Sequence, residues 1–281
     1  RRPPRSTLSS SSAASDVYKR QLPDQIELPI NVPEEKLEVS REMYRHYLAM
    51  ILAVDEMVGR VLKYLDDKNL TDNTIVLFTS DHGTQGGSQG VNPWSKKNPF
   101  DASIHVPGII RYPGSISPGT RTQQIVNMVD WFPTLCGLAG LRVPRSIEGQ
   151  DRSEILRNNG DVEQGAAFIM NFSKWFDWFE NGAEWRGVRT NTHTYARWLD
   201  GRELLYDLQE DPFQMNNLAG KHLSVQASLQ ELLAHTQSLR NDELVPCKDW
   251  KHWLDEQRRV IKNAYGPLSH PESEPDWSLI H

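Results

Sequence analysis

Asp81, His82 and Gly83 follow an apolar run at residues 75–78. Such a run is typical of a buried strand, and in open α/β sheets ligands gather beyond the carboxyl ends of the strands. The glycines that follow allow the next loop to approach a ligand closely. The triplet therefore places a carboxylate and an imidazole side by side where an α/β enzyme carries its chemistry. An ordinary turn is the alternative, because Asp and Gly also favour turns for conformational reasons.

Lys96 follows this glycine-rich loop and supplies a cation that can meet an anion. Its neighbour Lys97 is predicted to be a solvated charge, because consecutive side chains rarely point into the same pocket. Lys96 is therefore the candidate for an anion-binding group.

A long helix is predicted before the apolar run. Apolar side chains recur at three- and four-residue spacings through residues 41–66, which favours an amphipathic helix packed on a sheet. Asp55 lies on that apolar stripe and is interpreted as a structural acceptor for loop amides, because a buried carboxylate is costly unless it is hydrogen-bonded. Turn residues at 69–73 then lead into the strand.

Two more apolar segments follow the candidate site. Residues 106–112 predict a short strand that a Pro-Gly pair ends, and residues 126–130 form a third apolar segment. Trp131 then opens a helix with Pro133 near its first turn. The order of elements is that of an α/β protein.

The second half of the chain divides from the first near residue 165 and has a different pattern. Short alternating segments separated by turn residues predict an antiparallel meander. These segments are residues 166–172, 185–189, 194–198 and 203–208. A helix at residues 223–239 is predicted to cover one face. Its inward side chains are expected to be Val225, Leu229, Leu232 and Leu233.

Two features of this half are candidates for substrate contact. The aromatic cluster at residues 175–179 is interpreted as core packing between subdomains, with a platform for sugar or aryl rings as the alternative. His193 lies in a predicted loop that could border the site, and the same two interpretations apply to it.

The composition of the 281 residues excludes several classes of protein. An apolar content of 38 % suits a globular domain, and a net charge of −6 argues against a nucleic-acid partner. No apolar run approaches the ~18 residues that a membrane span needs. The two cysteines provide no disulfide framework.

Residues 1–23 are treated as a disordered leader of non-native appearance. They are rich in Arg and Ser and show no apolar periodicity, so they bury too little surface to fold. They also lack the central apolar run of a signal peptide. A translated linker is favoured over a nucleic-acid-binding tail.

Taken in order, the motifs of residues 24–240 resemble those of the type I sulfatases, within the alkaline-phosphatase-like superfamily. The motifs are Val54-Asp55, Asp72-Asn73-Thr74, Ser80-Asp81-His82-Gly83, Lys96, Pro99-Phe100-Asp101, His105-Val106-Pro107, Asp130, Pro133-Thr134-Leu135, Arg186-Gly187-Val188-Arg189 and Leu204-Leu205-Tyr206-Asp207. Their fixed order makes the resemblance specific. It implies a partial alkaline-phosphatase-like sandwich, an α/β fold, in residues 24–165. It also implies a small C-terminal antiparallel sheet with a packed helix, followed by a tail, in residues 166–281.

The resemblance also implies roles for site residues. Asp81 and His82 would be ligands of one divalent cation, usually calcium, with Asp81 contributing most because Ca²⁺ prefers oxygen donors. Lys96 would contact the sulfate and the nucleophile. Asp101 and His105 stand where the family often has Glu and Arg, and we treat both as structural.

Part of the family's active site has no counterpart in this sequence. Type I sulfatases act through a Cys/Ser-x-Pro-x-Arg motif whose first residue is oxidised to formylglycine, and its hydrated form attacks sulfur. The surroundings of Cys136 and Cys247 do not fit that motif. The paired aspartates that complete the metal site are also missing. We therefore expect a C-terminal fragment that holds a metal weakly and hydrolyses nothing alone.

Three functions remain open on these grounds. The first is a fragment of a sulfatase acting on carbohydrate or aryl sulfates. The second is a phosphonate or phosphate ester hydrolase of the same superfamily, and the third is a non-catalytic binding module that keeps the fold. The resemblance implies a periplasmic or secreted location for the parent protein.

Overall fold

The computed structural model describes residues 25–158, 165–171, 184–244, 262–263 and 266–267. The predicted leader, the aromatic cluster at 175–179 and most of the predicted tail lie outside these residues. None of the helices in the described segments is both long and apolar enough to cross a membrane.

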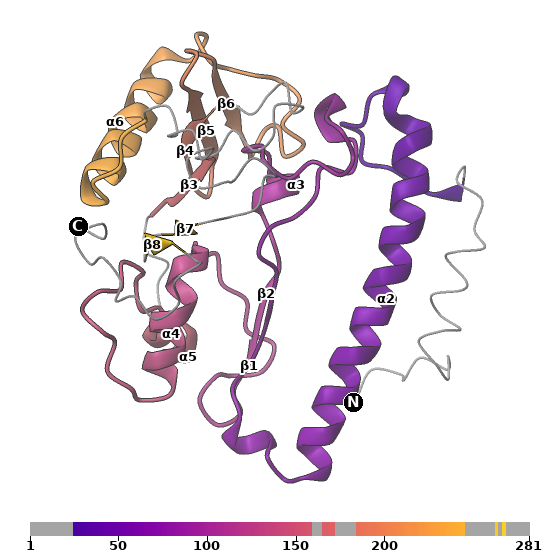
Figure 1. Cartoon of the computed structure of the whole chain (residues 1–281), viewed down its shortest axis with the longest axis vertical. Coiled ribbons are helices and arrows are strands. Elements are labelled where there is room, and N and C mark those ends of the chain that lie inside the picture. The colour runs from indigo at the N-terminus through magenta and orange to yellow at the C-terminus, as the bar shows by residue number, and fades with distance from the viewer. Residues whose placement is uncertain (1–24, 159–164, 172–183, 245–261, 264–265, 268–281) are drawn as a thin grey trace.

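The longest element is helix α2 (Leu37–Asp67), which follows the short 3-10 helix η2 (Glu34–Lys36). It confirms the helix predicted at residues 41–66. Its buried residues are Ser40, Met43 and Ala49, all in its first half. The predicted packing on a sheet is wrong for the second half, where no residue from 50 to 67 is buried. In Figure 1, α2 stands along one side of the molecule.

The 3-10 helix η3 (Thr71–Asn73) connects α2 to strand β1 (Val76–Thr79). Strand β2 (Gly108–Arg111) pairs with β1 in antiparallel register, with Phe78 opposite Ile109. Both predicted strands are confirmed, and they form a two-stranded sheet. Between them the chain forms the 3-10 helix η4 (Ser88–Gly90) and the short helix α3 (Asp101–Ile104).

A small helical group follows β2. It contains the 3-10 helix η5 (Met128–Asp130), α4 (Trp131–Leu138) and α5 (Ser153–Asn158). Helix α4 begins at the predicted residue, and the capping box of Asn127 and Asp130 fixes the turn before it. Asp130 is buried, and its Oδ1 accepts a hydrogen bond from the Gln150 amide at 2.9 Å.

The second sheet is an antiparallel meander in the order β3-β4-β5-β6, as predicted. Its strands are β3 (Ala167–Asn171), β4 (Trp185–Arg189), β5 (His193–Trp198) and β6 (Glu203–Asp207). Helix α6 (Leu223–Leu239) packs on it. Leu229 and Leu233 join the buried core with Val188, Tyr195 and Leu205. Each such side chain contributes roughly 1.5–3 kcal/mol by burial, so this part has a core of its own. Later in the sequence, the short strands β7 (Lys262–Asn263) and β8 (Gly266–Pro267) pair with each other in antiparallel register.

Residues 95–104 are fastened to this second sheet at several points. The Trp185 indole Nε1 donates to the Lys97 carbonyl at 2.8 Å. The Arg189 guanidinium donates two hydrogen bonds to the Asp101 carboxylate. The Asp101 amide donates to Gln214 Oε1 at 2.7 Å. The meander therefore positions the segment that carries Lys96.

Candidate functional site

The loop after β1 is pinned by a close backbone contact at Gly83. Its amide donates to the Ser103 carbonyl at 2.8 Å. A Cβ atom at this position would lie 2.1 Å from the Ala102 carbonyl oxygen, which no side chain tolerates. Glycine is therefore required here for close approach, and the contact holds Asp81 and His82 against α3.

Asp81 and His82 face each other at the end of β1. Asp81 Oδ2 lies 3.3 Å from His82 Nε2, and Asp81 Oδ1 accepts the His82 amide at 2.9 Å. That backbone hydrogen bond lowers the pKa of Asp81, so the carboxylate is charged at neutral pH. The Asp81 side chain is 79 % exposed and that of His82 39 %, so both are open to a ligand.

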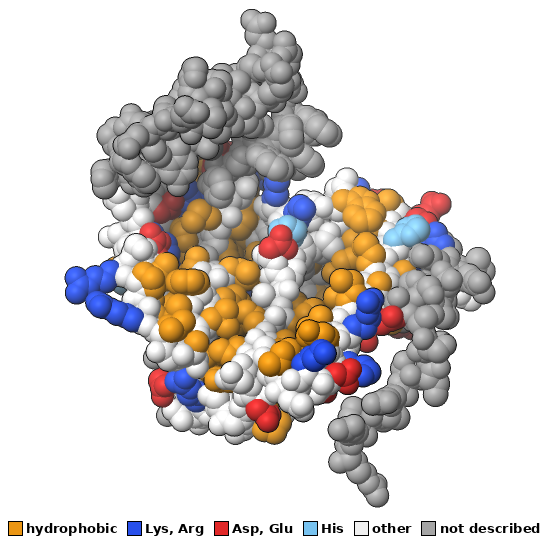
Figure 2. All heavy atoms as spheres, turned by 60° about the horizontal axis from the view of Figure 1, so that its bottom comes forward, with side chains coloured by type: hydrophobic (Ala, Val, Ile, Leu, Met, Phe, Trp, Pro, Cys, Tyr) orange, Lys and Arg blue, Asp and Glu red, His pale blue; other side chains and the backbone are white. Residues whose placement is uncertain are grey.

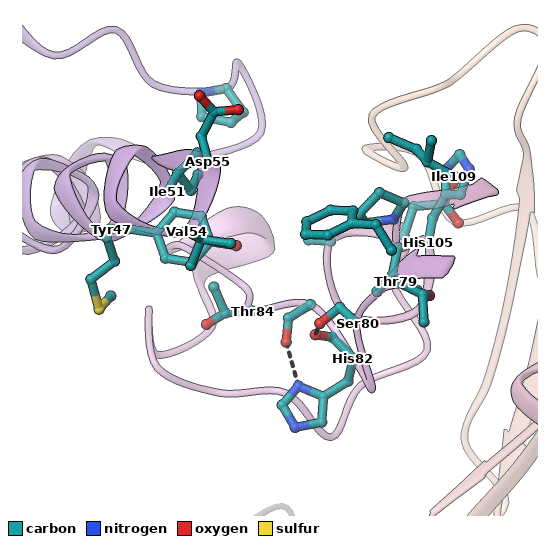
Figure 3. A pocket seen from close by; sticks show the side chains of 18 of the residues that line it. Tyr47, Ile51, Val54, Asp55, Thr79, Ser80, His82, Thr84, His105 and Ile109 are labelled. Atoms are coloured by element: carbon teal, nitrogen blue, oxygen red, sulfur yellow. Dashed lines mark hydrogen bonds and ion pairs between the residues drawn. The ribbon is translucent and has the colours of Figure 1, made fainter. Parts of the chain in front are cut away.

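The hydrogen bonds around His82 prepare one ring nitrogen for a cation. Nδ1 lies 2.9 Å from the Gly83 carbonyl oxygen, as the dashed line in Figure 3 marks, and a carbonyl only accepts, so Nδ1 carries the proton. In the neutral ring, Nε2 then presents its lone pair beside a carboxylate oxygen. Two facing acceptors are satisfied by a proton or a metal ion between them. One oxygen and one nitrogen donor therefore fit part of a divalent cation site.

The described residues supply only part of such a site. No group of three or more His, Cys, Asp or Glu side chains in the described segments could hold a metal ion. Calcium takes 6–8 oxygen ligands. The pair Asp81 and His82 alone would therefore bind calcium weakly.

The structure gives the two neighbouring lysines different surroundings. Lys96 is exposed and has no ion pair with another described residue, so its role in anion binding stays a prediction. Lys97 is half-buried, and burial lowers its pKa, assisted by the neighbouring charge of Lys96. The prediction that Lys97 is a solvated charge is wrong, because its segment lies against Trp185 of β4.

Asp101 joins the two parts of the molecule. Its Oδ1 accepts from Arg189 Nε at 3.1 Å and its Oδ2 from Arg189 Nη2 at 2.8 Å, a two-pronged contact. His105 Nδ1 lies 3.5 Å from Oδ2. Burial alone would raise the pKa of Asp101, but the hydrogen bonds from His105 and Arg189 outweigh it and lower the pKa to about 2. These contacts agree with the structural roles expected for Asp101 and His105.

His193 begins β5 and sits opposite Asp207 of β6. Its Nε2 lies 3.9 Å from Asp207 Oδ2, and its Nδ1 lies 2.9 Å from the Thr192 hydroxyl. Its place in a sheet rather than a loop gives it neighbours within the meander. A contact of His193 with substrate stays a prediction.

A groove of about 990 Å³ separates α2 from the β1–β2 sheet. We call it the α2 groove; its apolar walls include Tyr47, Ile51, Val54, Val58, Leu62, Val76, Phe78 and Ile109. Figure 3 shows Val54 and Ile109 on opposite sides of it, with His82 at one end. Figure 2 shows hydrophobic side chains gathered on the face that is lowest in Figure 1.

Asp55 lines this groove instead of supporting a loop. Its side chain is exposed, and it accepts no hydrogen bond from another described residue. The predicted structural role of Asp55 is therefore wrong in this arrangement, because the face of α2 that carries it is not covered.

Several polar groups at the groove were not found from the sequence. Gln214 is 2 % exposed, and its Nε2 has no partner among the described residues, like Asn31 Oδ1 and Thr79 Oγ1. Gln214 also has a left-handed backbone, with φ of 54°. No spacing pattern in the sequence marks a buried Asn or Gln side chain, so these groups can be found only from their surroundings in the structure.

Comparisons with known proteins agree with the motifs. The family described as Sulfatase matches residues 6–141, and the family described as N-sulphoglucosamine sulphohydrolase, C-terminal, matches residues 91–239. The ulvan-active sulfatase of Formosa agariphila is 37 % identical over 207 residues, which cover 73 % of this chain and 40 % of that protein. This chain therefore spans well under half the length of that relative.

Two solved structures are similar in fold. One is a protein in complex with its substrate D-glucosamine-2-N,6-O-disulfate, with a TM-score of 0.69 and 30 % identity over 76 % of this chain and 44 % of the other. The other is the phosphonate monoester hydrolase of Agrobacterium radiobacter, with a TM-score of 0.62 and 28 % identity. That match covers 73 % of this chain and 42 % of the other.

Proposed function

Because this chain belongs to the type I sulfatase family, we propose that it supplies the C-terminal part of an enzyme that hydrolyses sulfate esters. The observation that carries the proposal is the pair of donor atoms, Asp81 Oδ2 and His82 Nε2, facing each other at the end of β1. A charged carboxylate and a lone pair of fixed direction form part of a cation site where a substrate can reach it.

Calcium is the proposed cation, and Asp81 and His82 are its proposed ligands from this chain. Asp81 supplies most of the attraction because Ca²⁺ prefers charged oxygen donors, whereas the imidazole is the more replaceable contact. When bound, the ion withdraws negative charge from the oxygens of the ester group. The nucleophile, a formylglycine in this family, lies outside the sequence of this chain.

Lys96 is the proposed anion-binding group. It is exposed, so its ammonium is free to meet a sulfate, and the Trp185 contact at Lys97 holds its backbone in place. A positioned cation acts most strongly on charge that develops in the transition state. Truncating Lys96 should therefore lower kcat more than it raises KM.

Carbohydrate sulfates are the proposed substrates. The support is the similarity to a protein solved with a disulfated glucosamine and to an ulvan-active sulfatase. Aryl sulfates are less favoured, although they serve as convenient probes.

Phosphonate ester hydrolysis is the second candidate. The fold similarity to a phosphonate monoester hydrolase supports it, and the Asp81 and His82 pair would serve either anion. A non-catalytic binding module is the third candidate, favoured if no nucleophile accompanies this chain.

The upstream coding sequence of the parent gene provides the first test. A Cys/Ser-x-Pro-x-Arg motif together with a pair of aspartates supports the sulfatase, whereas a differently framed Cys or a Thr supports the phosphonate hydrolase. Absence of any such nucleophile from the complete gene would leave the binding module.

Kinetics of the complete enzyme provide the second test. Para-nitrophenyl sulfate and a phenyl phosphonate ester are assayed separately, one for each candidate activity. Asp81→Ala should abolish turnover, and added calcium should restore little of it. Lys96→Ala should cost roughly 2–4 kcal/mol in transition-state stabilisation. Lys68→Ala, at the exposed end of α2, is the matched control and should change neither kcat nor KM. Full activity in both site variants would refute the assignment.

A further inference from the structure

Trp94 is a large aromatic residue that is exposed to solvent two positions before Lys96. It is 58 % exposed, although the preceding Pro93 is buried, and Lys96 is exposed as well. A single exposed apolar side chain is ordinary on a protein surface and needs no explanation by itself. Trp94 differs from that ordinary case because the backbone that carries it is fixed on both sides.

Hydrogen bonds from the preceding part of the loop hold the chain on either side of Trp94. The Pro93 carbonyl accepts from the Gly86 amide at 2.9 Å. The Ser95 carbonyl accepts from the Gln85 amide, also at 2.9 Å. The backbone on each side of the exposed indole is therefore bound to the same short stretch of chain.

Two further contacts shape this loop. Asn92 forms a turn, since its side-chain oxygen accepts from the Trp94 amide at 3.0 Å and its carbonyl from the Ser95 amide at 2.9 Å. Gln85 anchors the loop from inside, because it is fully buried and its Nε2 donates to Ser103 Oγ at 2.6 Å. The loop is thus ordered before a ligand arrives, so little binding energy is lost in ordering it.

The pair of exposed groups suits a sugar that carries a sulfate. Two residues of chain span at most roughly 7 Å, so the side chains of Trp94 and Lys96 can reach one small ligand. The Lys96 ammonium attracts a sulfate. The indole face is apolar and carries partial negative charge, which suits the C–H groups on the face of a pyranose ring. A lipid tail or an apolar peptide would use the indole alone.

We propose that Trp94 is the platform on which the sugar ring of a carbohydrate sulfate stacks while Lys96 meets its sulfate group. The inference rests on the proposed function and adds to it a residue that determines substrate specificity. Removing the indole should therefore weaken the binding of the sugar without weakening the binding of sulfate itself.

Titration of the 281-residue chain tests the contact without catalysis. The tryptophan side chains are isotope-labelled, and the indole N–H resonance of Trp94 is identified by its absence from Trp94→Phe. The sugar ligands are D-glucosamine-2-N,6-O-disulfate and ulvan oligosaccharides, chosen from the two similar proteins described above, and inorganic sulfate is the comparison. We expect a saturable shift of the Trp94 resonance with at least one sugar and a much smaller shift with sulfate. The buried Trp185 is the internal control and should not move.

Kinetics of the complete enzyme separate the indole from the ammonium. Trp94→Ala should raise KM for the sugar sulfate by about 3–10-fold, the loss expected for one aromatic contact, and leave kcat within about twofold. Trp94→Phe should recover part of the loss because it keeps an aromatic face. The inhibition constant of inorganic sulfate should stay unchanged in Trp94→Ala and rise in Lys96→Ala. Leu239→Ala, 70 % exposed at the end of α6, is the matched control and should change neither KM nor kcat.

Three results would overturn the proposal. One is a Trp94 resonance that neither sugar moves. Another is a KM that changes no more in Trp94→Ala than in Leu239→Ala. The third is an equal rise of the sulfate inhibition constant in Trp94→Ala, which would show that the indole only supports Lys96. The proposed function fails separately: a complete enzyme that hydrolyses no sulfate ester would refute it, and the titration of the chain would still decide whether Trp94 binds sugar.

Discussion

The contact between Asp101 and Arg189 is predicted to be a strong link between the candidate site and the second sheet. The pair makes two hydrogen bonds at 3.1 and 2.8 Å, and the side chains are 21 % and 17 % exposed. The pKa of Asp101 falls from 3.8 to about 2 in the folded chain. Since one pKa unit corresponds to about 1.4 kcal/mol, the charged carboxylate stabilises the fold by roughly 2 kcal/mol.

The sign of the pH dependence follows from the lowered pKa. Above the unfolded-state pKa of 3.8, Asp101 is charged in both states and the stabilisation is fully present. As the pH falls from about 4 towards about 2, the unfolded chain takes up a proton first, and the stabilisation is lost. Stability should therefore decline across that window by more in the wild-type chain than in Asp101→Asn.

A double-mutant cycle measures this link. Asp101→Asn, Arg189→Gln and the double variant are unfolded in urea and followed by tryptophan fluorescence, to which Trp185, bonded to the Lys97 carbonyl, contributes. His105 as well as Arg189 lowers the pKa of Asp101, so we expect the coupling energy of the Asp101–Arg189 pair alone to be about 1 kcal/mol at pH 7 and to shrink as the pH approaches 2. The exposed helical pair Lys63 and Asp67, whose side chains are 73 % and 57 % exposed, is the control, with an expected coupling under about 0.5 kcal/mol. A coupling as small as that of the control, or one that ignores pH, would refute the reasoning.

Two further substitutions test the packing directly. Gly83→Ala should displace the loop, because the new Cβ would meet the Ala102 carbonyl oxygen at 2.1 Å, and calorimetry on the complete enzyme should show at least about tenfold weaker calcium binding. An unchanged calcium affinity would mean that the loop geometry is not required. Leu233→Ala should lower the free energy of unfolding by about 2–5 kcal/mol, whereas Leu223→Ala, 69 % exposed on the same helix, should cost under about 0.5 kcal/mol. Similar losses in the two variants by urea unfolding would contradict the assigned core.

The elements could be predicted from the sequence wherever local pattern decides structure. Helix α6 occupies the predicted residues 223–239, and the four meander strands lie within one or two residues of prediction, because helical spacing, alternation and turn residues are all local signals. Asp81 and His82 are adjacent in sequence, so their proximity was also foreseeable. That their donor atoms face each other depends on Gly83, whose carbonyl fixes the ring.

Other features depend on contacts between distant residues. Lys97 was expected in solvent, but Trp185, 88 positions away, covers its segment. Gln214 accepts a hydrogen bond from the Asp101 amide across 113 positions, and no local pattern predicts that contact. The apolar stripe of α2 was recognised, but a stripe does not reveal whether its partner is present. The prediction that Asp55 accepts hydrogen bonds from loop amides fails for that reason, since its face of α2 is exposed.

The fastening of residues 95–104 to the meander has a practical consequence for engineering. A chimera that exchanges C-terminal subdomains between relatives at residue 165 would separate Trp185 and Arg189 from their acceptors, the Lys97 carbonyl and the Asp101 carboxylate. The exchangeable unit instead starts ahead of Ser95, so that the lysine-bearing loop travels with the strands that carry it. Libraries cut at the earlier junction should yield more active hybrids than those cut at the later one.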